Sequence, residues 1–136
     1  MYIRSDESDR MFSENQVQSF RIHLKSPLML NQLWKVALVE CSANCGKAKL
    51  KKHQQDLFIY SDICTGSIVE GEDKPLLRRL VKNTKIGWEY IIDKPFYVPL
   101  RKHNISEIRI YIKDAQGNDV TFLEQPLLLT LVFAQI

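Results

Sequence analysis

The sequence predicts an all-β fold, either a sandwich or a barrel. Short apolar segments recur roughly every ten residues, turn residues separate them, and helical periodicity is almost absent. A length of 136 residues corresponds to one domain, and 45% hydrophobic against 26% charged residues excludes wholesale disorder. The longest apolar run, residues 127–134, is much shorter than the roughly 18 residues of a membrane span, so no span is expected.

Residues 1–16 differ from the rest of the chain. They hold four acids and two arginines, and their apolar residues follow no regular period. We therefore expect residues 1–16 to form a flexible arm outside the core, and residues 17–136 to form the single domain. This polar start is not a secretory signal, and three cysteines without such a signal indicate a reducing, intracellular compartment.

Two strands are expected at the start of the domain, at residues 17–24 and 34–41. In both strands the side chains alternate between two faces, and Ser26-Pro27 is expected to end the first strand. The second strand is apolar on both faces, which is typical of a strand inside a sandwich. The side chains expected to face the core are Phe20, Ile22 and Leu24 in the first strand and Trp34, Val36 and Leu38 in the second.

The middle of the chain contains one clear strand and one ambiguous segment. Residues 57–64 are rich in β-forming residues and predict a strand with Phe58 and Tyr60 in the core. Residues 75–82 place leucines at helical spacing within an otherwise β-forming chain, so helix and strand both stay open. Polar loops are expected on either side of the clear strand, at 42–56 and 65–74.

The last third of the chain is expected to be a succession of strands. Prolines cut the short apolar pieces at 87–92 and 95–100, which is typical of edge or corner segments. Residues 108–112 give the cleanest half-buried strand, and a turn at 114–119 leads to a strand at 120–123 and a final one at 127–134. The core residues expected here are Ile108, Ile110, Ile112, Leu129, Leu131 and Phe133.

The cysteines raise the question of a metal site. Cys41, Cys45, His53 and Cys64 are residue types that bind zinc, but they form no Cys-x-x-Cys pair, and Cys41 and Cys64 fall at strand ends. We therefore expect free thiols, no metal and no cofactor.

Catalytic motifs are absent from the sequence, which predicts a protein that is not an enzyme. It contains no Gly-x-Ser-x-Gly turn and no glycine-rich phosphate loop, and the acid pair Glu72-Asp73 lies in a charged loop. Basic clusters at 47–52 and 74–85 could contact phosphate. Because no aromatic residues are interleaved with these bases, a solvated face is the preferred interpretation, and nucleic acid is not expected as a partner.

A succession of segments after residue 16 carries a family resemblance. Its members are Ser19-Phe20-Arg21-Ile22-His23-Leu24, Trp34-Lys35-Val36-Ala37-Leu38, residues 57–63, Pro75-Leu76-Leu77-Arg78, Tyr97-Val98-Pro99-Leu100, residues 108–112, a turn at Gly117, Val120-Thr121-Phe122 and residues 129–133. In this order the segments resemble the penton-type minor capsid proteins of Polinton (Maverick) elements, adintoviruses and virophages. Two departures are a short connection at 42–56 and an ending, Phe133-Ala134-Gln135-Ile136, without the family's histidine or arginine.

The resemblance implies a single jelly-roll β-sandwich of two antiparallel sheets with about eight strands. It also implies a homopentamer at the five-fold vertex of an icosahedral virion capsid, assembled inside the host cell beside double jelly-roll major capsid proteins. Opposite charges in neighbouring loops suit head-to-tail contacts between copies. The interface candidates are Glu70, Glu72, Asp73, Arg78 and Arg79, with Asp6, Glu7 and Asp9 of the arm expected to reach an adjoining capsid subunit.

Two other functions stay open at this point. One is an intracellular β-sandwich that binds a sugar or a protein, with Trp88-Glu89-Tyr90 as the sugar-binding candidate. The other is a small basic barrel that binds nucleic acid.

Overall fold

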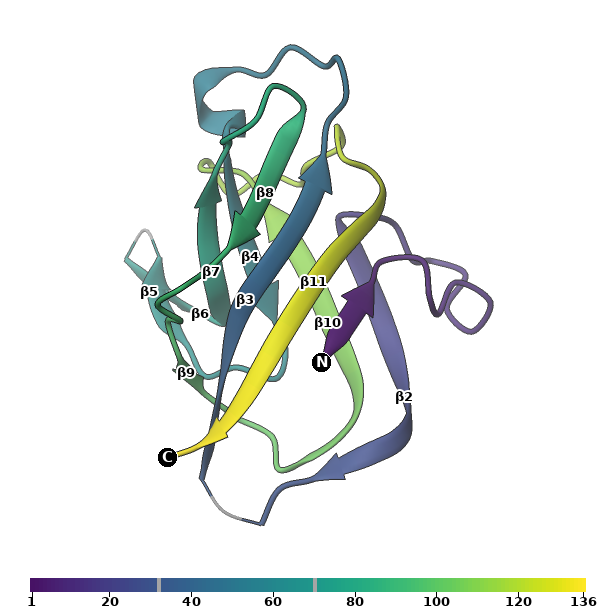
Figure 1. Ribbon diagram of the computed structural model, residues 1–136, viewed down its shortest axis with the longest axis vertical. Helices are drawn as coiled ribbons and strands as arrows, with labels where there is room; N and C mark the ends of the chain where they lie inside the picture. Colours follow the sequence, from purple (N-terminus) through teal and green to yellow (C-terminus); the bar gives the residue numbers. More distant parts are fainter. Residues whose placement is uncertain (32, 70) are drawn as a thin grey trace.

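The computed structural model describes residues 1–31, 33–69 and 71–136. Two antiparallel sheets pack face to face, and a short 3-10 helix η1 (Lys52–Gln54) lies at one end (Figure 1). The prediction of an all-β sandwich is confirmed. The strands are β1 (Tyr2–Arg4), β2 (Ser19–Met29), β3 (Trp34–Asn44), β4 (Asp56–Ser61), β5 (Ser67–Val69), β6 (Glu72–Lys74), β7 (Leu76–Val81), β8 (Gly87–Ile91), β9 (Val98–Pro99), β10 (Asn104–Lys113) and β11 (Glu124–Gln135).

The strand order is that of a jelly roll. The front sheet, nearer to the viewer in Figure 1, has the order β1-β11-β3-β8, with β9 also paired to β3. The back sheet has the order β2-β10-β4-β7, and β5 and β6 form a separate hairpin. With β5, β6 and β9 set aside, eight strands remain, and they pair first with last, second with seventh, third with sixth and fourth with fifth. This nested antiparallel pairing is the jelly-roll connectivity.

The beginning of the chain belongs to the sandwich. β1 pairs with β11, and the side chain of Ile3 is completely buried. The Ser5 hydroxyl accepts a hydrogen bond from the Leu127 backbone N–H at 2.9 Å. The expectation that residues 1–16 stay outside the core is therefore wrong for the first five residues. A three-residue strand contributes one inward side chain, so its sequence shows no alternation that would reveal it.

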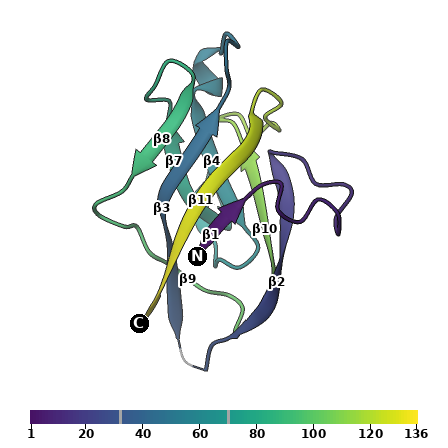
Figure 2. The same cartoon turned by 45° about the vertical axis from the view of Figure 1, so that its right-hand side comes forward.

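Residues 6–16 connect the two sheets. In Figure 2 this segment leaves β1 in the front sheet, projects to one side, and returns to β2 at the edge of the back sheet. It is therefore a connection within the jelly roll, anchored at both ends.

The ambiguous segment at 75–82 forms the strand β7. Leu77 and Leu80 are both buried although they stand three residues apart. The register between β4 and β7 shifts by one residue here, because Ile59 pairs with Arg78 while the next residue, Tyr60, pairs with Leu76. Such a bulge lets a strand bury residues at a helix-like spacing, which explains why the pattern was ambiguous.

The predicted core is confirmed in most strands and wrong in β4. In β4 the fully buried, inward side chains are Leu57 and Ile59, whereas Phe58 is only half-buried. Tyr60 is buried on the outer face, where its ring stacks on Tyr111 with centroids 5.1 Å apart. The predicted core residues that are buried inside the sandwich are Phe20, Ile22, Val36, Leu38, Ile108, Ile110, Ile112, Leu129 and Leu131. Leu24 and Phe133 are half-buried against this core, and Trp34 is half-buried outside it.

None of the described residues belongs to a helix that is long and apolar enough to cross a membrane.

Candidate assembly surfaces

The acidic candidates near the N-terminus are largely engaged within the chain. Arg4 Nε donates to Asp6 Oδ1 at 3.0 Å, and this guanidinium lowers the pKa of the Asp6 carboxyl. The Glu7 carboxylate accepts a hydrogen bond from the Arg4 backbone N–H at 2.9 Å. Asp9 is exposed and has no ion pair among the described residues. Of the three predicted acids, Asp6 is paired with Arg4, whereas the exposed Glu7 and Asp9 form no ion pair with a described residue.

The candidates around β6 and β7 form internal ion pairs as well. Arg79 contacts Asp56 with two nitrogens, at 2.7 and 2.9 Å from one carboxylate oxygen. Glu72 lies 3.7 Å from Lys74. Glu70 lies outside the described residues. The candidates that lack an ion pair with another described residue are Asp73, which is exposed, and Arg78, which is half-buried.

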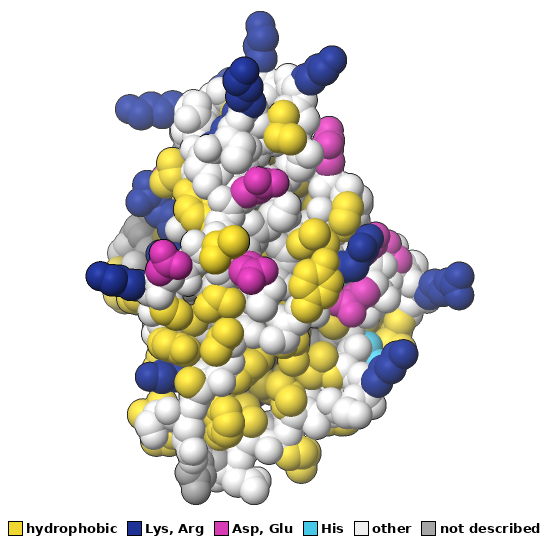
Figure 3. Space-filling model, in the orientation of Figure 1, with side chains coloured by type: hydrophobic (Ala, Val, Ile, Leu, Met, Phe, Trp, Pro, Cys, Tyr) yellow, Lys and Arg dark blue, Asp and Glu magenta, His cyan; other side chains and the backbone are white. Residues whose placement is uncertain are grey.

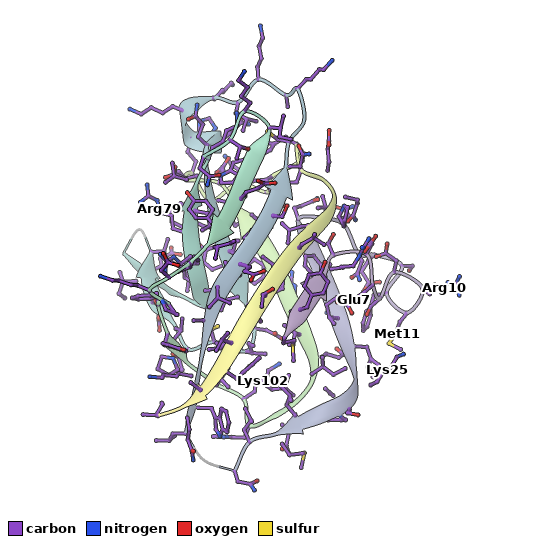
Figure 4. The ribbon with its side chains drawn as sticks, in the orientation of Figure 1. Glu7, Arg10, Met11, Lys25, Arg79 and Lys102 are labelled. Atoms are coloured by element: carbon purple, nitrogen blue, oxygen red, sulfur yellow. The ribbon has the colours of Figure 1, made fainter. Side chains whose placement is uncertain are left out.

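The two candidate groups lie on opposite sides of the molecule. Figure 4 shows Glu7 with Arg10, Met11 and Lys25 on the side of β2, and Arg79 on the side of β7. They do not form one site within a copy. A head-to-tail contact between copies joins two different surfaces, and these two sides are different surfaces.

Asparagine side chains cap two of the edge strands, which sequence reasoning missed. In β2, the Arg21 backbone N–H donates to Asn15 Oδ1, and Asn15 Nδ2 donates to the Arg21 carbonyl, both at 2.9 Å. In β8, the Glu89 N–H donates to Asn83 Oδ1 at 2.9 Å, and Asn83 Nδ2 donates to the Glu89 carbonyl. Each asparagine stands six residues before the residue that it caps. This repeated spacing is a signal that the sequence does contain.

The other two edge strands also bond to side chains. The Glu7 carboxylate accepts a hydrogen bond from the Arg4 N–H in β1, and the Tyr90 hydroxyl donates to the Val81 carbonyl in β7. All four edges of the two main sheets therefore have backbone groups that are already bonded to side chains. Such edges resist the addition of a strand from another chain.

The outer face of the front sheet is apolar and uncovered. It contains the front groove, of about 470 Å³, which is lined by residues 40–42, 89–91 and 128–130. Ile91 is 81% exposed, and Figure 3 shows hydrophobic side chains across this face with acidic ones among them. Glu40 and Glu89 lie on adjacent strands in diagonal positions, because Ser42 pairs with Glu89. Neither glutamate forms an ion pair with a described residue.

The outer face of the back sheet carries two opposed arginines, with the exposed Glu107 next to them on β10. Arg21 and Arg109 are directly opposite each other on β2 and β10, and both are exposed. Glu14 lies nearby but forms no ion pair with either arginine. Like charges in directly opposite positions destabilise a sheet, so a carboxylate from a partner would be favourable here. The β5–β6 hairpin covers another part of the face, where Val69 is buried near Phe58.

No family model, curated protein or solved structure matches this chain.

The sugar-binding candidate is directed into the protein. Trp88 is completely buried, and its indole N–H donates to the Gln55 carbonyl at 2.9 Å. Tyr90 is half-buried, with its hydroxyl bonded to Val81. Glu89 alone of this triplet is exposed, so the aromatic platform that a sugar would require is not present at these residues.

The three thiols are separate and buried. Burial raises the pKa of Cys41 and of Cys64 to about 12, which disfavours the thiolate form that binds metals and reacts as a nucleophile. All three cysteines, Cys45 included, are free. Across residues 1–31, 33–69 and 71–136, no three side chains of the histidine, cysteine, aspartate or glutamate type are grouped in a way that could hold a metal ion.

Proposed function

We propose that this chain is a structural subunit of an icosahedral capsid, a penton-type minor capsid protein whose five copies form a ring at the five-fold vertex. The observation that carries the proposal is the nested pairing of eight strands into a jelly roll. This connectivity is common among viral capsid proteins. It supports the family resemblance, because most of the similar segments lie in strands of this jelly roll.

The two outer faces supply a way to join the copies. The front sheet presents Glu40 and Glu89 in an apolar groove, and the back sheet presents Arg21 and Arg109. We assign the front face of one copy to contact with the back face of the next. Because these are different surfaces, the contact is heterologous, and a heterologous contact closes into a ring when its rotation allows. The capped edges support this assignment, since they leave the faces as the available surfaces.

The residues between β1 and β2 have a separate role in the proposal. Residues 1–5 belong to the front sheet and are needed there. We therefore assign residues 6–16 to the contact with an adjoining capsid subunit, the double jelly-roll major capsid protein. Asp9 is exposed in this segment, whereas Asp6 and Glu7 hold the segment to Arg4.

The test is the mass of the purified full chain in solution. Native mass spectrometry and sedimentation velocity at low salt should give a particle of five times 15.9 kDa, or about 80 kDa. Raising the salt concentration should weaken the ring, because exposed charges are screened. A chain that stays monomeric at every concentration and at low salt would contradict the proposal.

A further inference from the structure

The fold brings two lysine-rich segments together at one end of the sandwich. One is the connection after β3, residues 45–55, and the other is the turn between β7 and β8, residues 82–86. The Cys45 N–H donates to the Ile86 carbonyl at 2.6 Å, and the Lys82 N–H donates to the Gln55 carbonyl at 2.8 Å. These two backbone bonds fix the segments side by side, although about thirty residues separate them in the sequence.

The lysines at this end have no acidic partner in the described parts of the chain. Lys82 Nζ donates to the Lys85 carbonyl at 3.0 Å, and none of the group forms an ion pair. Three carboxylates lie near the two segments: Glu124 lies against Gly46, Asp114 lies 3.8 Å from His53, and Asp56 is bonded to Arg79. Figure 3 shows lysine and arginine side chains projecting from this end of the molecule. The basic end consists of Lys47, Lys49, Lys51, Lys52, Lys82 and Lys85, all exposed except the half-buried Lys82.

We propose that the basic end binds the phosphate backbone of double-stranded nucleic acid without regard to sequence. Ammonium groups on flexible stems bind phosphates as point charges, and neutralising several phosphates releases the counterions that drive such binding. Neither segment contains Phe, Tyr or Trp, and the one imidazole, that of the half-buried His53, lies 3.8 Å from Asp114, so the site does not favour single strands. The site is an addition to the proposed capsid function and does not depend on the ring.

The experiment measures binding of the full chain to a short labelled DNA duplex of mixed sequence by fluorescence anisotropy. Between about 50 and about 200 mM salt, four to six phosphate contacts give a logarithmic slope of about −4 to −5, or roughly a 10²- to 10³-fold loss of affinity. One strand of the duplex, tested alone, should bind no more tightly than the duplex itself.

The variant Lys49→Gln/Lys52→Gln/Lys85→Gln removes three charges in total, two from residues 45–55 and one from residues 82–86. Its affinity for the duplex should fall by at least tenfold, and its salt slope should become shallower by about 2.7, because each lost phosphate contact accounts for about 0.9. The matched control, Arg10→Gln/Lys25→Gln/Lys94→Gln, removes three exposed charges outside the basic end and should keep both the affinity and the slope. Equal thermal unfolding midpoints would show that both variants are folded.

Three results would overturn the inference. The first is no binding of the wild-type chain at the lowest salt, and the second is an equal loss in the control variant. The third is a basic-end variant that keeps its DNA affinity but no longer self-associates, because the end would then be a contact between copies. A monomeric chain that binds the duplex as described would reject the ring and leave this inference standing.

Discussion

The side chain of Asn15 forms with Arg21 the two hydrogen bonds that a neighbouring strand would form. The Arg21 N–H and carbonyl both lie on the free edge of β2, and the two amide atoms of Asn15 satisfy them at 2.9 Å. Asn83 does the same for Glu89 in β8, on the other sheet. Such caps oppose aggregation by strand pairing, which open edges promote, and they would suit the high local concentration of the proposed capsid assembly.

Removing these caps should lower stability and promote aggregation. We expect Asn15→Ala and Asn83→Ala each to lower the free energy of unfolding by about 1 kcal/mol, because two exposed hydrogen bonds between the asparagine side chain and the backbone are lost. Light scattering during prolonged incubation should rise more in the double variant than in either single one. Asn104→Ala is the control, since the Asn104 side chain forms no hydrogen bond with another described residue. Equal aggregation in all of these variants would contradict the capping role.

The direction of side chains in β4 gives a second prediction. Ile59 is completely buried between the sheets, whereas Phe58 is half-buried on the outer face. Ile59→Ala should therefore destabilise the protein by about 2–5 kcal/mol, as buried isoleucine truncations do. Phe58→Ala should cost less, although it removes the larger side chain. Urea denaturation of the two variants decides the order, and a larger loss for Phe58→Ala would contradict this register.

The β4 register shows where sequence reasoning reaches its limit. Leu57, Phe58, Ile59 and Tyr60 are all apolar, so alternation cannot say which pair faces the core. The orientation of β4 depends on the β5–β6 hairpin, which covers part of the outer face and lets aromatic side chains be half-buried there. In β10, by contrast, charged residues alternate with isoleucines, and the predicted face is confirmed.

The candidate assembly surfaces could be predicted only in part, for a different reason. The sequence identifies exposed charges such as Arg79, but the ion pair with Asp56 depends on the pairing of β4 with β7. The basic end likewise depends on backbone bonds between two distant segments. Contacts of this kind follow from the tertiary fold, and local patterns do not contain them.

Ile3 provides a third prediction, on the role of the first strand. Its side chain is completely buried, and β1 forms the edge of the front sheet. Ile3→Asp should place an unpaired carboxylate in the core and largely unfold the protein, because burying an isolated charge is very unfavourable. Met11→Asp, in the connection after β1, should leave the unfolding transition nearly unchanged, since Met11 is exposed. Far-ultraviolet circular dichroism and thermal unfolding measure both variants. A native-like transition for Ile3→Asp would show that β1 is not needed for the fold.

The buried thiols predict a dependence of stability on pH. Burial raises the pKa of Cys41 and Cys64 from 9.0 to about 12 in the folded protein. Between these values the unfolded chain binds fewer protons than the folded chain, so stability falls as the pH rises above about 9. Below that value both states hold their protons, and the thiols contribute no pH dependence. Denaturant midpoints measured across this range should fall less steeply in Cys41→Ala/Cys64→Ala than in the wild type. The native thiols should also react much more slowly with an alkylating reagent than those of the unfolded chain.

The contact between outer faces leads to a charge-exchange prediction for the ring. Glu40→Lys/Glu89→Lys makes the front groove basic, so it should repel Arg21 and Arg109 of the next copy and dissociate the ring at low salt. Arg21→Glu/Arg109→Glu should have the same effect by making the back face acidic. A chain that carries all four substitutions restores opposite charges on the two faces, and its mass should return to that of the wild type. Sedimentation velocity compares these chains with Arg10→Glu/Lys94→Glu, which reverses two exposed bases outside the two sheets and should leave the ring intact. If the two reversals dissociate the ring but their combination does not restore it, the faces do not contact each other. If neither reversal has an effect, the copies meet through other residues, with Arg78 and Asp73 as the next to be reversed.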